Sequence, residues 1–167
     1  MVQGAFLQNT TNGLRIKTWQ GSSGFARRII FQNMQMENVK RPIIIDQYYC
    51  DSKIPCLNKT SAVKVSEVAY MSIKGTSATK EVMRFACSQT VPCENIILAD
   101  IDLTVTSGFA PTTYCENAIG CTMGSVSPYS CLQNYNQKSN YEFSIPVSND
   151  RRKGKQDKRD YISYLQR

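Results

Sequence analysis

The residues with the clearest chemical potential are two cations, Arg15 and Lys17, in the segment 12–19 (NGLRIKTW). Alternate residues of a β-strand face the same side, so these side chains would lie about 7 Å apart and could clamp an anion. Arginine offers a carboxylate a bidentate fork, and lysine offers a point charge. The same residues also fit a structural ladder, in which Asp46 of the next repeat lies under Lys17, whereas Arg15 lies over Ile44 and has no such partner.

The strand with these cations belongs to a repeat that has two families of strand patterns. The first family covers residues 28–36, 67–75 and 95–103. The second family covers residues 14–17, 43–46 and 83–86. From one start to the next, the first family advances by 39 and then by 28, and the second by 29 and then by 40. Strands that recur on every turn predict an all-β coil of parallel rungs, with an extra loop at 50–60 in the longer step. A β-sandwich is the alternative, but it would not give both families matching steps.

Alternation within the second family predicts which side chains fill the coil. The expected inward residues are Leu14, Ile16, Ile45 and Phe85. The expected outward residues are Arg15, Lys17, Ile44, Asp46, Arg84 and Ala86. One outer face of the coil is therefore expected to be polar.

Cysteine spacing favours disulfides over a metal site. Seven cysteines lie at positions 50, 56, 87, 93, 115, 121 and 131, which gives three Cys-x5-Cys pairs and one cysteine more. Structural zinc sites close with shorter steps and often use histidine, which this sequence lacks. Reduced, buried cysteines are the alternative. We expect no cofactor and no metal.

Charge and the chain ends suggest one folded body with a tail. Residues 150–167 carry seven of the 20 Lys and Arg but three of the 13 Asp and Glu. We expect a disordered, solvated tail over 133–167; a nucleic-acid contact or nuclear address is the less favoured interpretation. The sequons at Asn9 and Asn58 are candidate glycosylation sites. No signal peptide or membrane span is recognisable, so either the protein stays in the cytosol or its true N-terminus is missing.

The segment 12–19 resembles the Arg-Ile-Lys signature of glycoside hydrolase family 28, the polygalacturonases and their relatives. The resemblance continues through 31–33 (FQN), 42–50 (PIIIDQYYC), 87–93 and 114–131, and it covers roughly residues 4–132. It implies a right-handed parallel β-helix over 1–132, truncated at its N-terminal side, and inverting hydrolysis of α-1,4-galacturonan. The implied parent is secreted to the plant cell wall and monomeric, with pectin as partner and no nucleic acid or membrane.

The resemblance also assigns roles to individual residues. Arg15 and Lys17 would bind a galacturonate carboxylate, and Tyr49 would contact the substrate from the next rung; packing against the 50–60 loop is the alternative for Tyr49. The implied disulfides join Cys50 to Cys56, Cys87 to Cys93, and Cys115 to Cys131. Cys121 is then a free thiol that could compete with Cys131 or join two molecules.

Inverting hydrolysis needs one carboxyl group as acid and another as base, and the family holds its aspartates and a histidine before the Arg-Ile-Lys strand. This sequence has no histidine and no Asp-Asp. We interpret Asp100 and Asp102 as a solvated face on a different strand family. We therefore expect the chain alone to be inactive; the alternatives are a non-catalytic galacturonan-binding module and a degenerate product.

Overall fold

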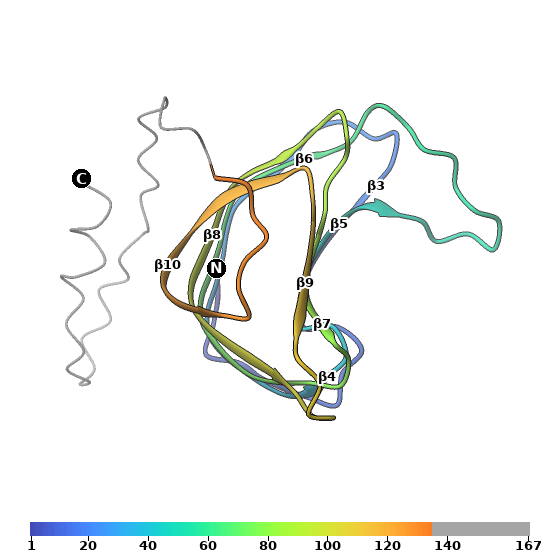
Figure 1. The fold of residues 1–167 in the computed structure, drawn as a ribbon. Coiled ribbons are helices and arrows are strands. Elements are labelled where there is room, and N and C mark those ends of the chain that lie inside the picture. Colours follow the sequence, from blue (N-terminus) through green and yellow to red (C-terminus); the bar gives the residue numbers. More distant parts are fainter. Residues whose placement is uncertain (135–167) are drawn as a thin grey trace, which may run out of the picture. The chain divides into compact units, whose positions relative to one another are not determined.

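The structure is a computed structural model, and it describes residues 1–134. This part of the chain contains ten strands, all of which pair in parallel. The strands are β1 (Val2–Gln3), β2 (Phe6–Gln8), β3 (Leu14–Trp19), β4 (Phe25–Val39), β5 (Ile43–Tyr49), β6 (Lys64–Ser77), β7 (Glu81–Ala86), β8 (Cys93–Val105), β9 (Thr112–Glu116) and β10 (Ala118–Ser127). One sheet has the order β1-β4-β6-β8-β10, with β2 also on β4, and the other has the order β3-β5-β7-β9. Figure 1 shows the two sheets on opposite sides of a coil.

The strand registers confirm the predicted repeat. Leu14 pairs with Ile43 and Ile43 with Met83, which reproduces the steps of 29 and 40. In the other sheet Phe31 pairs with Tyr70 and Tyr70 with Leu98, at steps of 39 and 28. Each sheet therefore takes one strand from every rung, as a parallel β-helix requires, and the β-sandwich alternative is wrong.

Strands β4, β6 and β8 are longer than the predicted segments because each one bends at left-handed residues. Asn33, Ser72 and Asp100 have φ values of 54°, 53° and 52°, and their spacing repeats the steps between the rungs. Such backbone is uncommon for residues with a side chain, and asparagine and aspartate tolerate it best. The bends recur at the same place on each rung of the coil. Each of the long strands β4, β6 and β8 therefore covers more than one side of the coil.

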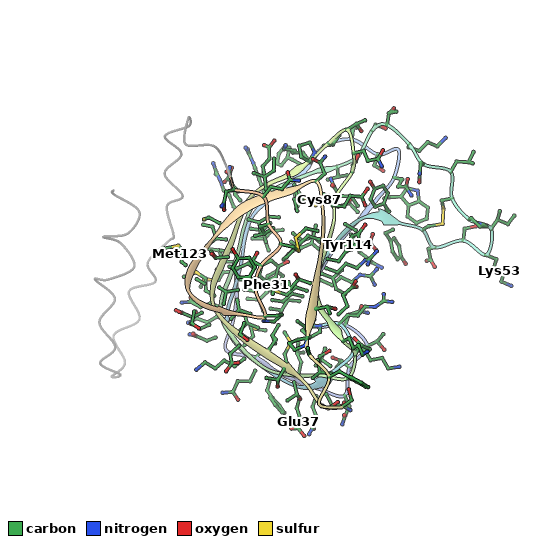
Figure 2. The ribbon with its side chains drawn as sticks, viewed as in Figure 1. Phe31, Glu37, Lys53, Cys87, Tyr114 and Met123 are labelled. Atoms are coloured by element: carbon green, nitrogen blue, oxygen red, sulfur yellow. A yellow bond between two sulfur atoms is a disulfide. The ribbon has the colours of Figure 1, made fainter. Side chains whose placement is uncertain are left out.

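The interior of the coil is a continuous stack of apolar side chains. Ile16 and its partners along the rungs, Ile45 and Phe85, are buried, as predicted. Tyr70 lies between the rings of Phe31, at 5.3 Å, and Phe85, at 6.3 Å. Figure 2 shows Phe31 inside the coil. Burial of these stacked side chains supplies the main stabilisation of the body.

One glycine permits the close stacking of two rungs. Gly75 has a φ of 141°, and a Cβ atom built on it would lie 2.0 Å from the carbonyl oxygen of Met36. A larger residue at this position would push β4 and β6 apart, because backbone atoms cannot give way as a flexible side chain can.

Backbone pairing continues to the end of the described region. Gln133 forms a parallel bridge with Ile119, and its backbone exchanges hydrogen bonds with Gly120 and Ala118. The paired structure therefore continues one residue beyond the predicted limit at 132. The rest of the predicted tail, from residue 135 on, lies outside the described residues. No helix that could cross a membrane occurs within residues 1–134.

Candidate functional site

The outer face of the sheet β3-β5-β7-β9 carries two columns of side chains that run along the coil. Registers between neighbouring strands define the columns as Arg15, Ile44, Arg84 and Tyr114, and Lys17, Asp46, Ala86 and Glu116. Ile44 is 2% exposed and Ala86 3%, although both belong to outward columns. The accessible part of the face is therefore polar and aromatic.

Arg15 has the ion-pair partner that the sequence interpretation gave to Lys17. Its Nη2 lies 3.3 Å from Oδ2 of Asp46, and each side chain is 23% exposed. Asp46 lies opposite Lys17 in the register, as predicted, but its carboxylate turns diagonally to Arg15. The expectation that Arg15 lacks a partner is therefore wrong. The preference has a physical cause, because the guanidinium fork directs its donors to a fixed carboxylate whereas the lysine chain is free to turn elsewhere.

The guanidinium of Arg15 keeps unused hydrogen-bond capacity. It has five N–H donors, and Asp46 is its one hydrogen-bond acceptor among residues 1–134. The Nε atom is buried without any partner in the same region. The carboxylate of Asp46 is also held from behind, because its Oδ1 accepts a hydrogen bond from the backbone N–H of Tyr48 at 3.0 Å. Asp46 therefore holds the Arg15 guanidinium in position, and some of the guanidinium N–H donors have no partner.

Lys17 turns toward Tyr49 and makes a cation–π contact. Its Nζ lies 4.0 Å from the ring centroid, and the Cζ of Arg15 lies 5.3 Å from the same centroid. The Tyr49 ring, one rung away, thus brings the two cations together. The structure therefore places Tyr49 against both predicted anion-binding residues.

Trp19 is a functional candidate that the sequence interpretation missed. It continues the alternating pattern of Arg15 and Lys17 toward the end of β3. Trp19 is 47% exposed, and its ring meets that of Tyr49 edge to face at 5.8 Å. A large aromatic surface that stays exposed beside two cations can pack on an apolar ring face of a ligand. The signal was present in the sequence as the second outward position after Arg15.

Farther along the same face, Glu116 on β9 accepts hydrogen bonds from two tyrosines. Its Oε1 lies 3.1 Å from the hydroxyl of Tyr48, and its Oε2 lies 3.2 Å from that of Tyr114. Partial desolvation, together with the negative charge of Glu116, raises the pKa of Tyr48 and of Tyr114 above the usual value. Both hydroxyls therefore keep their protons at neutral pH and act as donors.

Arg84 lies in the same group of side chains as Tyr114 and Glu116, but it does not pair with the Glu116 carboxylate. Its Nη1 lies 3.1 Å from Glu81, and its Cζ lies 4.3 Å from the Tyr114 ring centroid. No ion pair joins it to Glu116 within the described residues. The face therefore has two separate groups, one around Tyr49 and one around Glu116.

Three disulfides hold the loops of the coil. They join Cys50 to Cys56, Cys87 to Cys93, and Cys115 to Cys131, which are the pairs that the resemblance implies. The first one closes the loop that protrudes beyond β5 in Figure 1, and Figure 2 shows Lys53 on that loop. Gln20 anchors the loop beside Trp19, since its Oε1 accepts a hydrogen bond from the backbone N–H of Lys59 at 3.3 Å.

The other predicted positions lie away from this face. Cys121 is an exposed free thiol on β10, and desolvation raises its pKa, which disfavours the reactive thiolate. Asn9 and Asn58, the candidate glycosylation sites, are both exposed. Asp100 and Asp102 lie on β8 of the other sheet, and Asp100 accepts a hydrogen bond from the backbone N–H of Ser125 at 3.3 Å. Within residues 1–134 no cluster of His, Cys, Asp or Glu is suited to hold a metal ion.

Comparison with known proteins gives one consistent result. Residues 1–131 match the family described as Glycosyl hydrolases family 28. A probable polygalacturonase of Arabidopsis thaliana is 49% identical over 132 residues, which is 78% of this chain and 30% of that protein. A polygalacturonase of Persea americana is 56% identical over 119 residues, 71% of this chain and 26% of its own length. Polygalacturonase-2 of Solanum lycopersicum is 50% identical over 118 residues, with the same coverage of both chains. The chain thus spans between about a quarter and a third of these relatives.

Proposed function

We propose, from the premise that this chain belongs to glycosyl hydrolases family 28, that it supplies the carboxylate-binding part of a polygalacturonase-type active site. The substrate would be galacturonan, the polymer of pectin, in which each sugar carries a carboxylate. The observation that carries the proposal is the convergence of Arg15 and Lys17 on the ring of Tyr49, at 5.3 and 4.0 Å. Two cations on one exposed face favour an anionic ligand, and the relatives named above are polygalacturonases.

The roles of the three residues follow from their chemistry. Arg15 would present its free guanidinium donors to one carboxylate oxygen of the sugar, because Asp46 holds the other side of the group. Lys17 would leave the Tyr49 ring or extend over it to reach the same carboxylate. Trp19 would pack against the sugar ring, since this residue is 47% exposed beside the pair.

We propose that the chain by itself binds the polymer without cutting it. Hydrolysis with inversion requires a proton donor and a base about 6.5–9.5 Å apart on opposite sides of the bond. On β3 and β5 the one carboxylate is Asp46, and Arg15 holds it as an ion pair. The sequence has neither the histidine nor the Asp-Asp motif that the resemblance calls for. Cleavage would therefore depend on groups outside the residues described.

We also propose that the protein is secreted and acts as a monomer in the plant cell wall. Three disulfides support an oxidising compartment, because the cytosol keeps thiols reduced. The two exposed sequons, at Asn9 and Asn58, are consistent with that route. Mass spectrometry of the protein from a secreting plant host would detect glycans at these positions.

Calorimetric titration with trigalacturonate tests the binding role. We expect the double variant Arg15→Ala/Lys17→Ala to bind at least about tenfold more weakly than the natural chain, because each charge-assisted contact contributes more than about 1 kcal/mol. The control is Arg27→Ala/Lys74→Ala, which removes the same charge from the six-stranded sheet. If both double variants lost affinity for trigalacturonate equally, the loss would reflect the net charge of the protein and not a site at Arg15 and Lys17, which would overturn the proposal. Unchanged affinity in Arg15→Ala/Lys17→Ala would overturn the proposal.

A further inference from the structure

The charge of the outer face changes sign along the coil. β3 and β5 carry two cations and one anion, a net charge of +1, whereas β7 and β9 carry one cation and two anions, a net charge of −1. These residues are, in the same order, Arg15, Lys17, Asp46, Arg84, Glu81 and Glu116. A ligand that follows the columns therefore passes from an attractive region for anions to a repulsive one.

Glu116 is the anion whose charge is least compensated. Asp46 faces Arg15 and Glu81 faces Arg84, each within 3.3 Å. Glu116 has two neutral partners, the hydroxyls of Tyr48 and Tyr114, which contact both of its oxygens without cancelling the charge. The Tyr48 hydroxyl also lies 3.1 Å from the carbonyl oxygen of Cys87, which holds that ring in place. Glu116 is thus a rigidly held negative charge.

The position of Glu116 matches the path of a ligand bound at the first rung. Lys17, Asp46, Ala86 and Glu116 occupy successive rungs of one column. Neighbouring rungs lie about 4.8 Å apart, so Glu116 lies roughly 14 Å from Lys17 along the coil. A hexose ring is about as long as one rung spacing. An oligosaccharide with its first carboxylate at Arg15 and Lys17 would therefore bring its third or fourth sugar to Glu116.

We infer that Glu116 is a specificity-determining residue that disfavours an ionised uronate at the β9 end of the face and favours a neutral sugar there, such as methyl-esterified galacturonate. This inference rests on the proposed binding of galacturonan at Arg15 and Lys17. Two carboxylates brought within a few ångströms repel each other, whereas an ester carries no charge and is not repelled. The preferred ligand of this face is therefore partly esterified galacturonan.

The test uses Glu116→Gln, which keeps the shape of the side chain and removes its charge. Calorimetric titrations with digalacturonate and tetragalacturonate, both as free acids, separate the two ends of the face, because two sugars do not reach β9. We expect Glu116→Gln to bind tetragalacturonate about fivefold more tightly than the natural chain and to bind digalacturonate equally well. Tetragalacturonate that keeps the carboxylate bound by Arg15 and Lys17 but is methyl-esterified on the sugars that reach β9 should show no such gain.

The matched control is Glu37→Gln, which removes one exposed negative charge from β4 on the other sheet, as Figure 2 shows. This variant should change neither affinity. An equal gain for both oligomers in Glu116→Gln, or no gain for the tetramer, would overturn the inference while leaving the proposed function intact. Failure of the natural chain to bind either oligomer would instead overturn the proposed function, and the inference with it.

Discussion

The two faces of the sheet β3-β5-β7-β9 come from alternate residues of the same four strands, yet they have opposite properties. The inner face stacks the buried side chains of Ile16, Ile45 and Phe85, where shape and volume decide the fit. The outer face carries ion pairs and cation–π contacts on partly exposed side chains. Residues that stabilise the fold and residues that face a ligand are therefore neighbours along the same strand. Substitutions one residue apart should therefore affect different measurements.

The largest expected effect comes from Phe85→Ala on the inner face. It leaves a cavity beside Tyr70 and should lower the free energy of unfolding by about 3–5 kcal/mol. Arg84→Ala, one residue earlier on the outer face, should change it by less than about 1 kcal/mol, because its ion pair with Glu81 is more than one third exposed. Urea denaturation of both variants checks the contrast. Similar losses would show that the two faces are not energetically distinct.

A second expected effect concerns Gln47, a buried polar residue on the inner side of β5. Its Nε2 donates to the carbonyl of Val63 at 2.6 Å, and its Oε1 accepts from the backbone N–H of Ser88 at 2.7 Å. Gln47→Leu removes both hydrogen bonds and introduces an apolar side chain of similar size. It should cost about 3 kcal/mol because two buried backbone groups lose their hydrogen-bond partner. Thermal denaturation checks this value. A variant as stable as the natural chain would show that these backbone groups find other partners.

The smallest expected effect is a gain in stability from Tyr70→Phe. The hydroxyl of Tyr70 is buried without a hydrogen-bond partner among residues 1–134, so its removal should stabilise the fold by about 1 kcal/mol. Burial also raises the pKa of Tyr70 far above its ordinary value of 10.0. The folded protein therefore holds this proton when the unfolded chain releases it, and stability should fall as pH rises above about 10.

Tyr70→Phe should reduce this alkaline loss, which denaturation curves at pH 8 and about pH 11 would reveal. The natural chain should lose more stability between the two pH values than the variant does. An equal loss in both proteins would assign the alkaline sensitivity to other groups.

Much of the fold could be predicted from the sequence, because a solenoid repeats its pattern on every rung. The steps of 29 and 40 in one strand family, and of 39 and 28 in the other, reappear as strand registers. The bends at Asn33, Ser72 and Asp100 could not be predicted, since one asparagine, one serine and one aspartate share no obvious pattern. Left-handed backbone at serine depends on the stacked rungs around it and not on its own preference.

Less of the candidate site could be predicted, because side-chain partners depend on rotamers and not on register alone. Register places Asp46 opposite Lys17, yet the carboxylate turns to Arg15. The contact between Tyr48 and Glu116 joins positions far apart in the sequence and spans two rungs, so it has no local signal. Trp19 was visible as an outward position, but its exposure depends on how Tyr49 packs against its edge. Geometry across rungs is therefore the information that the sequence lacked.

The most direct test of the central claim is a crystal structure of the protein with trigalacturonate. We predict a sugar carboxylate about 3 Å from both the Arg15 guanidinium and the Lys17 ammonium, with the sugar ring beside Trp19. Asp46 should keep its contact with Arg15 in the complex. A trisaccharide bound on another face, with Arg15 and Lys17 unchanged, would contradict the claim that the outer face of β3 and β5 recognises galacturonate.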